Sequence, residues 1–429
     1  MKPPMHPEST LVHIEKPIYG GAFLARVGGK AVFVPLTLPA EQVRVRMLAD
    51  KRGYRLAEVE RILAPSQERV TPMCRHFGAC GGCDYQHANY EAQLGFKQAI
   101  LRETLERGGV RVPSEIGMLA ANPCGYRNRI RLAIDAAGNL GYRGRRSHRV
   151  VPIAECPIAA PLLIRAALAI WDIAAKSLLQ LGHAEISFFC DANETELLVG
   201  IQGERQANFA LNGLSTAMAV KVPELIGTEY TVADSAGRPE RTVARWGRSS
   251  LAYRAAEFEY RVDQGAFFQV NRWLVDALVG AVAERQQGAL AWDLFAGVGL
   301  FARRLASSFQ QVVAVESAPR ATAALAHNLN GAGARAVKMS TLDFLRRGQR
   351  GERPDLIVAD PPRTGLGAET TALLATVQAP RLVYVSCDPA TLARDLRGLI
   401  ASGYRIEKIT LADLFPQTFH LESIVHLQR

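Results

Sequence analysis

From Trp273 onward the chain repeats one local order: an apolar run, a turn rich in glycine or proline, and a segment with helical spacing. The apolar runs are Trp292–Phe295, Val312–Glu316, Leu356–Asp360 and Arg381–Ser386. Strands buried on both faces appear in sequence as such runs, and helical crossovers between them make neighbouring strands parallel. This order predicts an α/β fold with a parallel, Rossmann-like sheet.

The preceding sequence shows two other patterns. Short alternating runs between Thr10 and Leu63 predict strands at Ala31–Val34, Val43–Met47 and Leu56–Ile62, with a spacing typical of a small β-barrel. The stretch from Tyr126 to Val262 mixes expected strands (Ile186–Phe189, Leu197–Ile201) with a helix (Leu162–Lys176). We therefore expect an OB-like barrel at 1–65, a mixed α+β central domain at 66–262 and the Rossmann-like domain at 263–429.

The chain is basic, with 51 Lys and Arg against 41 Asp and Glu and a net charge of +10. This charge favours an anionic partner, above all nucleic acid, although a bias toward Arg is also typical of a GC-rich genome. No apolar run reaches the roughly 18 residues of a membrane span, and the first residues lack an export signal. We expect a cytoplasmic monomer with no membrane contact and no obligate protein partner.

The segment Asp293–Ala302 joins an expected strand to an expected helix through Gly297 and Gly299. Glycines at such a turn let the backbone approach a nucleotide-like ligand, and Glu316, at the end of the next strand, can accept ribose hydroxyls. The segment also fits the looser dinucleotide pattern G-x-G-x-x-A, and a purely structural turn is a further alternative. An adenosine-containing cofactor is the preferred interpretation.

Two later segments narrow the chemistry. Asp360-Pro-Pro-Arg-Thr-Gly-Leu366 follows an expected strand, and its prolines fix a rigid turn where ligands of α/β sheets bind. Cys387 ends the next strand before an expected helix at Thr391–Leu396, whose N-terminus is expected to lower the thiol pKa. A buried, inert cysteine is the alternative interpretation.

The pairing of Asp360–Leu366 with Val385-Ser-Cys387-Asp-Pro-Ala-Thr-Leu-Ala-Arg-Asp395 resembles the RNA uracil-C5 methyltransferase family, as does the tail Leu414–Ser423. The resemblance implies that Cys387 adds to C6 of a uracil, that C5 takes a methyl group from S-adenosylmethionine, and that Glu422 removes the C5 proton. Independently, the apolar surroundings of Glu422 favour a raised pKa suited to a base, whereas a solvated strand-end glutamate is the alternative.

The same family has a segment like Gln264-Gly-Ala-Phe-Phe-Gln269-Val-Asn271. The resemblance implies cofactor contacts from Gln269, Phe295 and Glu316, and Asp360 is expected to face cofactor or substrate. Two positions depart from the family pattern. Leu300 replaces a polar Asn, and Asp388 replaces an Asn after the nucleophile, adding a charge that would raise the thiol pKa unless it is paired.

Three cysteines, Cys74, Cys80 and Cys83, fall within ten residues with the spacing Cys-x5-Cys-x2-Cys. Iron–sulfur clusters take four cysteine thiolates, whereas zinc would also accept His76 or His87, and unligated thiols are a third possibility. The segment resembles the [4Fe–4S] site of the rRNA-modifying branch of the family. That resemblance implies Cys156 as the fourth ligand.

Two surfaces are candidates for RNA. The N-terminal strands resemble the TRAM domain, a small RNA-binding barrel. In Arg127-Asn-Arg129-Ile-Arg131, alternation along a strand would place all three arginines on one face, where they would contact phosphates. A basic face that merely contacts solvent is the alternative.

The expected function is methylation of C5 of a uridine in large-subunit (23S) rRNA, with S-adenosylmethionine and a [4Fe–4S] cluster as cofactors. A tRNA uracil-C5 or an RNA cytosine-C5 methyltransferase is the nearest alternative. A nicotinamide-dependent oxidoreductase would explain the glycine turn but not Cys387 with Glu422. A radical methylthiotransferase would need a Cys-x3-Cys-x2-Cys motif, and a non-catalytic RNA-binding protein would not need Cys387.

Overall fold

The computed structural model describes residues 9–179, 184–203, 210–232, 241–348 and 352–429. The chain forms two compact units. The first, here called the N-terminal unit, comprises Met1–Glu103, Gly144–Ser147 and Phe415–His420. The second, the main unit, comprises Thr104–Arg143, His148–Leu414 and Leu421–Arg429. Among the helices in these described ranges, none has the length and apolar character needed to cross a membrane.

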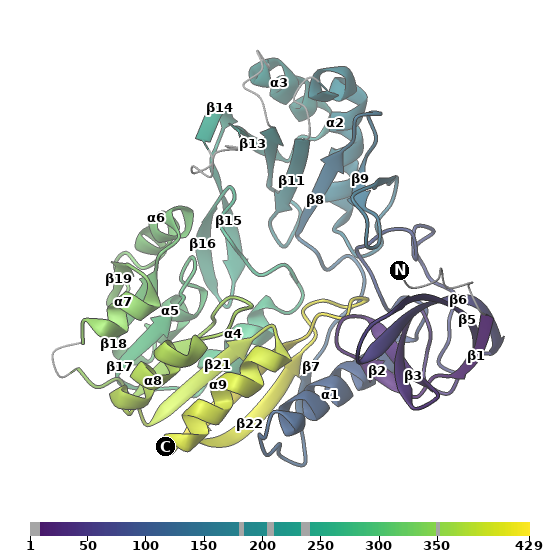
Figure 1. Ribbon diagram of the computed structural model, residues 1–429. Helices are drawn as coiled ribbons and strands as arrows, with labels where there is room; N and C mark the ends of the chain where they lie inside the picture. Colours follow the sequence, from purple (N-terminus) through teal and green to yellow (C-terminus); the bar gives the residue numbers. More distant parts are fainter. Residues whose placement is uncertain (1–8, 180–183, 204–209, 233–240, 349–351) are drawn as a thin grey trace. The chain divides into compact units, whose positions relative to one another are not determined.

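The N-terminal unit contains a curved six-stranded sheet, drawn in purple in Figure 1. Its strands are β1 (Ser9–His13), β2 (Lys16–Ile18), β3 (Ala22–Val27), β4 (Lys30–Pro35), β5 (Gln42–Asp50) and β6 (Tyr54–Ala64), in the order β1-β5-β6-β4-β3-β2. The three strands expected from sequence lie within β4, β5 and β6. Alternate side chains of the sheet meet in an apolar core with Tyr85 and with Phe96 of α1 (Tyr90–Arg107).

The central part of the main unit is a seven-stranded sheet with α2 (Pro161–Leu179) and α3 (Leu211–Lys221) packed against it. The strands are β8 (Arg129–Ile134), β9 (Leu140–Arg143), β10 (Val150–Pro152), β11 (Ala184–Cys190), β12 (Leu197–Gly203), β13 (Leu225–Val232) and β14 (Arg241–Gly247). The expected strands at 186–189 and 197–201 pair antiparallel, with Ile186 opposite Ile201.

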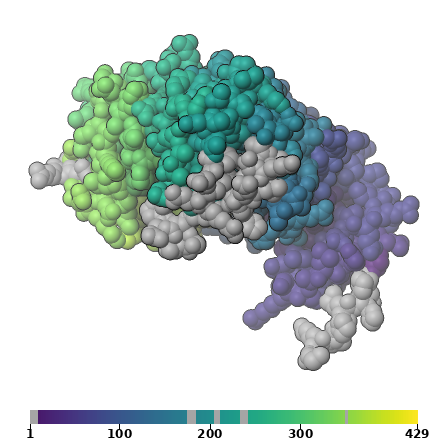
Figure 2. Space-filling model, turned by 90° about the horizontal axis from the view of Figure 1, so that it is seen from above, coloured from purple at the N-terminus to yellow at the C-terminus, as the bar shows by residue number. Residues whose placement is uncertain are grey.

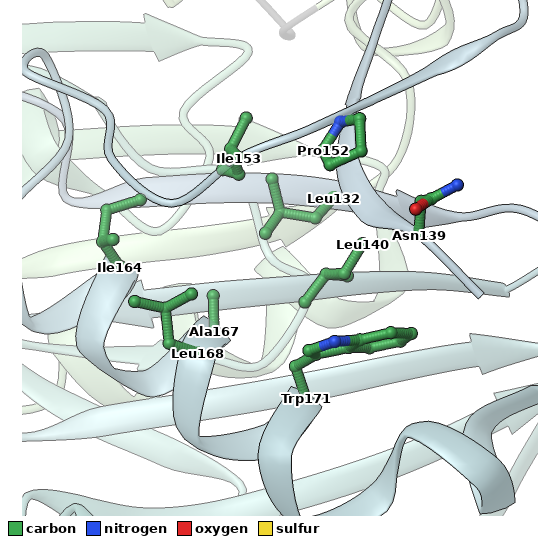
Figure 3. A pocket seen from close by; sticks show the side chains of 9 residues that line it. All are labelled: Leu132, Asn139, Leu140, Pro152, Ile153, Ile164, Ala167, Leu168 and Trp171. Carbon is green, nitrogen blue, oxygen red and sulfur yellow. The ribbon is translucent and has the colours of Figure 1, made fainter.

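The helix-covered side of this sheet carries an apolar hollow of about 110 Å³ (Figure 3). Leu132 and Leu140 contribute from the strands, and Leu168 and Trp171 contribute from α2. Its polar side chain, Asn139, donates its amide to Asp135 at 3.0 Å. We interpret the hollow as imperfect packing between helix and sheet.

The C-terminal part of the main unit is an eight-stranded sheet in the order β19-β18-β17-β20-β21-β23-β22-β7. Its strands are β7 (Gly117–Leu119), β17 (Gly288–Leu294), β18 (Phe309–Glu316), β19 (Ala334–Lys338), β20 (Leu356–Ala359), β21 (Arg381–Ser386), β22 (Arg405–Ala412) and β23 (Glu422–Gln428). The connecting helices are α4 (Val275–Ala283), α5 (Leu300–Leu305), α6 (Pro319–Asn328), α7 (Thr341–Arg346), α8 (Gly367–Val377) and α9 (Pro389–Ala401). The hairpin β15 (Ser250–Ala255) and β16 (Phe258–Asp263) precedes them.

The four strands expected from sequence are β17, β18, β20 and β21, and they are parallel as predicted. The chain moves outward from β17 to β18 and β19 and then returns to the other side of β17 at β20. Ligands of open α/β sheets bind at such a reversal, at the carboxyl ends of the strands. Because β23 runs antiparallel to β21, its first residue lies at this same edge.

In the space-filling view, the teal surface of the central part of the main unit meets the green surface of its C-terminal part (Figure 2).

Candidate active site

Cys387 and Glu422 meet at the carboxyl edge of the C-terminal sheet. The last paired residues of β21 and β23 are Ser386 and Ser423, and the Ser423 hydroxyl donates to the Ser386 carbonyl at 3.2 Å. Cys387 and Glu422 are the next residues along the two strands, so the antiparallel register sets them opposite each other. Residues 35 positions apart in the sequence are thereby placed side by side.

The Cys387 thiol is not activated in the way its position before a helix predicts. Burial and, after it, the nearby Glu422 and Asp360 carboxylates together raise its pKa to about 12, and Arg363 opposes them. The expected lowering by the helix N-terminus is therefore wrong for the free protein, because burial and two carboxylates outweigh it. The thiol is protonated at neutral pH and needs a proton acceptor before it can attack.

Glu422 is a buried carboxyl with raised basicity. It is 6% exposed, and its Oε1 has no hydrogen-bond partner among the described residues. Burial raises the pKa of Glu422 well above its ordinary value, the charge of Asp360 raises it further, and Arg363 lowers it. Burial likewise raises the pKa of Asp360, which directly follows β20. The site thus holds two basic carboxylates beside one thiol.

Asp388, the first departure from the family pattern, caps α9. Its Oδ1 accepts from the backbone amides of Ala390 at 3.0 Å and Thr391 at 2.9 Å. Carboxylates are stabilised at this end of a helix by the free amides and by the helix dipole. The extra charge is therefore paired, and the main charge effects on the pKa of Cys387 come from Glu422, Asp360 and Arg363.

The turn after β17 has the shape of a cofactor cradle. Phe295, Gly297 and Gly299 have positive φ values of 63°, 57° and 92°. A Cβ at Gly297 would meet no atom within 4 Å, so space lies open above this backbone. The left-handed conformation is uncommon for an aromatic residue, and such strain gathers at functional sites.

The carboxylate of Glu316 holds this turn in place. Its Oε2 accepts from the backbone amide of Gly297 at 2.9 Å, and its Oε1 accepts from the amides of Ser317 and Ala318, each at 2.6 Å. Glu316 therefore lies beside the glycine turn, as the cofactor interpretation requires. The open backbone and the acidic side chain suit an adenosine-containing group.

Asp293 is a candidate that the sequence analysis missed. It is completely buried in β17, its Oδ2 accepts from the Ala302 amide at 2.8 Å, and its Oδ1 has no partner among the described residues. Burial and, to a lesser extent, the charges of Asp360 and Glu316 together raise its pKa to about 8. Its position two residues before the left-handed turn is the sequence signal that could have identified it.

Gln269 approaches from the loop between β16 and α4 and is 8% exposed. Asn128 holds that loop, since its side-chain amide donates to the Gln269 carbonyl at 2.9 Å and to the Tyr253 hydroxyl at 3.0 Å. Phe268 packs against the Tyr253 ring, with ring centres 4.4 Å apart. Phe267, by contrast, is 64% exposed, an aromatic surface that the sequence analysis did not single out.

The basic strand expected to face RNA is only partly free to do so. Arg127 precedes β8, whereas Arg129 lies over the Phe189 ring at 4.0 Å and donates to the Ala266 carbonyl at 2.6 Å. Burial lowers the pKa of Arg129 to about 10. Arg131 alone of the three matches the expectation, with a 70% exposed side chain. The expectation of three phosphate-facing arginines is wrong, because Arg129 braces the Gln264–Asn271 loop.

A polar hollow of about 290 Å³ lies where the open face of the central sheet meets this loop. Its lining includes Arg131, Ser187, Gly200, Gln264 and Arg320. Gln264 is 7% exposed, and its Oε1 has no partner among the described residues. Around the hollow, four arginines pair with two glutamates, which leaves two positive charges in excess: Arg131 and Arg143 with Glu185, and Arg245 and Arg320 with Glu229.

The cysteine loop is ordered but does not form a metal site by itself. Within the described ranges, no three His, Cys, Asp or Glu side chains gather closely enough to hold a metal ion. Gln86 accepts from the Cys74 amide at 3.0 Å and donates to the Cys83 sulfur at 3.3 Å. Cys156, in the main unit, lies 3.8 Å from the Tyr142 hydroxyl. The four-cysteine ligand set therefore stays a prediction.

The alternative zinc ligand His87 is part of the apolar core of the N-terminal unit. Its Nε2 donates to the Thr37 carbonyl at 2.9 Å, and burial lowers its pKa to about 4. Its ring lies near those of Phe23 and Phe77.

Comparison with known proteins agrees with this geometry. A family described as tRNA (uracil-5-)-methyltransferase matches residues 352–429, which include Asp360, Cys387 and Glu422. The 23S rRNA (uracil(1939)-C(5))-methyltransferase RlmD of Halomonas elongata is 32% identical over 96% of this chain and 87% of its own length. The enzyme of the same name from Chromohalobacter salexigens is 34% identical over 97% and 88%.

Among solved structures, the tRNA (uracil-54, C5)-methyltransferase of Pyrococcus abyssi, in complex with S-adenosyl-L-homocysteine, matches with a TM-score of 0.78. The match covers 98% of this chain and 100% of that one at 24% identity, a likeness that shows the fold. The chain belongs to the family of S-adenosylmethionine-dependent RNA uracil-C5 methyltransferases.

Proposed function

We propose that this enzyme methylates C5 of a uridine in 23S rRNA through a covalent adduct with Cys387. The observation that carries the proposal is the pairing of Cys387 with Glu422 at the carboxyl edge of the sheet, beside Asp360. A thiol and two basic carboxylates are the groups that addition to C6 and proton removal from C5 require.

The reaction divides into two steps at the protein. The Cys387 thiol passes its proton to a neighbouring carboxylate, and its sulfur forms a bond to C6 while the C5–C6 double-bond electrons move to C5. S-adenosylmethionine supplies the methyl group that C5 then takes up. Glu422 removes the remaining proton from C5, the C5–C6 double bond forms again, and the bond between C6 and the Cys387 sulfur breaks.

Burial serves the second step. The raised pKa of Glu422 makes its ionised form a stronger base. Arg363 lowers the pKa of both Cys387 and Glu422, so it stabilises negative charge wherever the proton leaves. We assign Arg363 to this electrostatic role.

The cofactor is proposed to lie across the glycine turn, with contacts from Gln269, Phe295, Glu316 and Asp360. Support comes from the left-handed backbone at 295–299 and from the position of Glu316 beside Gly297. Leu300, the second departure from the family pattern, is a buried residue at the start of α5, and its carbonyl accepts from Tyr260 at 3.1 Å.

The rRNA target rests on the relatives named for uracil 1939 of 23S rRNA, which this chain matches over nearly its whole length. The polar hollow beside Gln264 supports an RNA path, because its excess positive charge suits phosphates and its unpaired acceptor suits a 2′-hydroxyl. The N-terminal sheet is proposed to be a TRAM-type, OB-like RNA-binding barrel.

The remaining parts of the proposal rest on sequence. Cys74, Cys80, Cys83 and Cys156 are proposed to hold a [4Fe–4S] cluster, supported by their spacing and by the hydrogen bonds to the Cys80 and Cys83 sulfurs. No catalytic step is assigned to the cluster. We also propose a cytoplasmic monomer that works without a membrane or an obligate protein partner.

The test uses a 23S rRNA fragment that carries 5-fluorouridine at the target position, with the corresponding tRNA fragment and a 5-fluorocytidine version for comparison. Because fluorine does not leave as a proton does, the adduct should persist on a denaturing gel. Cys387→Ala should abolish the adduct, whereas Cys124→Ser, a half-buried cysteine of the same unit, should retain it.

An adduct that persists in Cys387→Ala would contradict the assignment of the nucleophile. If only the tRNA fragment or only the cytidine fragment is trapped, the target is that tRNA uridine or that cytidine and not an rRNA uridine. Binding of a nicotinamide cofactor without any adduct would instead favour the oxidoreductase alternative.

A further inference from the structure

The segment Phe415–His420 connects β22 to β23, yet it belongs to the N-terminal unit and not to the unit that contains both strands. Glu422, the proposed base, begins β23 two residues after this segment ends. The chain thus enters β23, and reaches the base, from a segment that another part of the sequence holds.

Gln417, in the middle of the segment, forms hydrogen bonds with three residues of the N-terminal unit. Its carbonyl accepts from the backbone amides of Asp84 at 2.8 Å and Tyr85 at 3.0 Å. Its side chain and backbone form a reciprocal pair with Gln93 of α1. Gln93 Nε2 donates to Gln417 Oε1 at 2.9 Å, and the Gln417 amide donates to Gln93 Oε1 at 3.0 Å. Gln93 and Gln417 are 1% and 2% exposed, so water does not compete for these bonds.

Three further contacts fix the ends of the segment. Buried Lys97 donates to the Phe415 carbonyl at 2.9 Å, and the Phe419 amide donates to Asp84 Oδ2 at 3.4 Å. Phe419 packs edge-on against Tyr19, with ring centres 5.6 Å apart. Asp84 is itself held by Arg145 at 2.6 Å.

This arrangement holds Gln417 in a conformation that it would not adopt freely. Its φ is +69°, in the left-handed region. Such a conformation in a residue other than glycine costs on the order of 1 kcal/mol or more, and it persists only where the surroundings impose it. The hydrogen bonds from Asp84, Tyr85 and Gln93 supply that constraint.

We infer that Gln93 and Gln417 are positioning residues, which hold the 415–420 segment so that Glu422 enters β23 within reach of the C5 proton. The inference rests on the proposed role of Glu422. Proton removal is sensitive to distance, because a base must lie within hydrogen-bond reach of its proton. Attack by Cys387 is less sensitive, since Cys387 is placed by β21 and α9 and not by this segment.

The inference separates two events that a simple loss of stability would not separate. Loosening the segment should slow release of the methylated adduct while leaving methyl transfer nearly intact. A protein that is merely less folded would lose both rates in the same proportion, and no adduct would accumulate.

The experiment follows single turnovers of the full-length enzyme with a 23S rRNA fragment of ordinary uridine and a methyl-labelled donor. Gln93→Leu has a similar size but makes none of the amide hydrogen bonds. The variant should transfer the methyl group at close to the normal rate. Its release of the adduct should be on the order of tenfold slower, which is less than the rate loss expected when a general base is removed altogether. The labelled covalent complex should therefore appear on denaturing gels.

Gln417→Asn gives a second variant, because Asn tolerates the left-handed conformation but is too short for the same pairing with Gln93. It should accumulate adduct to a smaller extent, and it decides the matter if Gln93→Leu does not fold. Ala99→Ser, on the exposed side of the same helix, should behave as the unmodified enzyme does.

Glu422→Gln serves as the reference for the proposed function. If Glu422→Gln accumulates labelled adduct and folded Gln93→Leu does not, the positioning role is wrong while the base assignment stands. If Glu422→Gln accumulates none, the base assignment fails and the positioning inference fails with it. Equal losses of transfer and release in both Gln93→Leu and Gln417→Asn would also overturn the inference.

Discussion

Cys387 and Glu422 occupy the first positions beyond the antiparallel pair Ser386–Ser423, so the reacting thiol and the proposed base come from neighbouring strands of one sheet. Asp360 follows β20, the strand on the other side of β21. The three acidic groups therefore share one edge of the sheet. Their mutual effects on pKa follow from this closeness together with burial.

The rate of adduct formation should rise with pH between pH 7 and pH 9. With a thiol pKa of about 12, only about one molecule in ten thousand carries the thiolate at pH 8, and this fraction grows about tenfold per pH unit. Single-turnover trapping on 5-fluorouridine RNA measures the rate. A flat profile would show that proton transfer from Cys387 is not part of the slow step.

Removing the positive charge of Arg363 should slow that same step. Arg363 lowers the pKa of Cys387, so Arg363→Gln should raise the pKa of this thiol. The rate of adduct formation should then be lower at every pH below that pKa. Arg363→Lys keeps the charge and should lose less. Equal rates in Arg363→Gln and the unmodified enzyme, measured by the same trapping assay, would argue against the electrostatic role.

Asp388→Ala should destabilise the protein by about 1 kcal/mol, because it removes the cap of α9. Asp388→Asn accepts the same amide hydrogen bonds and should be nearly neutral. Because the main effects on the pKa of Cys387 come from burial, Glu422, Asp360 and Arg363, the pH profile of Cys387 alkylation should be nearly the same in Asp388→Asn and the unmodified enzyme. A clearly faster alkylation of Asp388→Asn would contradict this separation of roles.

Arg129 and Arg131 should differ in effect although they lie two residues apart on one strand. Arg129→Met leaves the Ala266 carbonyl without its donor and should cost about 1–3 kcal/mol of unfolding free energy. Arg131→Ala should leave stability almost unchanged but reduce the salt dependence of RNA binding by about one released counterion. Chemical unfolding and binding titrations over a range of salt concentrations test both; the reverse assignment of effects would contradict the structure.

Anaerobically purified protein should contain about four irons per chain, the content of a four-cysteine cubane cluster. Cys80→Ser should lose the iron and the brown colour, whereas Cys190→Ser, at a buried cysteine that ends β11, should keep them. Metal analysis and visible absorption give the result. Stoichiometric zinc without iron would contradict the proposed cluster and indicate a zinc site.

The sequence by itself determined the elements whose signals are local. The strands β17, β18, β20 and β21 were predicted because buried parallel strands require continuous apolar runs, and the turns at Gly297, Pro361 and Pro389 were predicted because glycine and proline restrict the backbone directly. Cys387, Asp360 and Glu316 could be named as candidates because each follows or ends one of these strands. Their place at one edge followed from the parallel order alone.

Only the tertiary structure decided the relationships that depend on distant parts of the chain. The antiparallel direction of β23 brings Glu422 beside Cys387, and no local pattern specifies that direction. Burial among carboxylates, and not the adjacent helix N-terminus, sets the pKa of Cys387. Arg129 donates a hydrogen bond to a distant loop instead of facing solvent, and Gln417 belongs to the N-terminal unit although the strands before and after it in sequence belong to the main unit. Each of these outcomes depends on which long-range neighbours supply the hydrogen bonds and charges, and the folded chain alone specifies those neighbours.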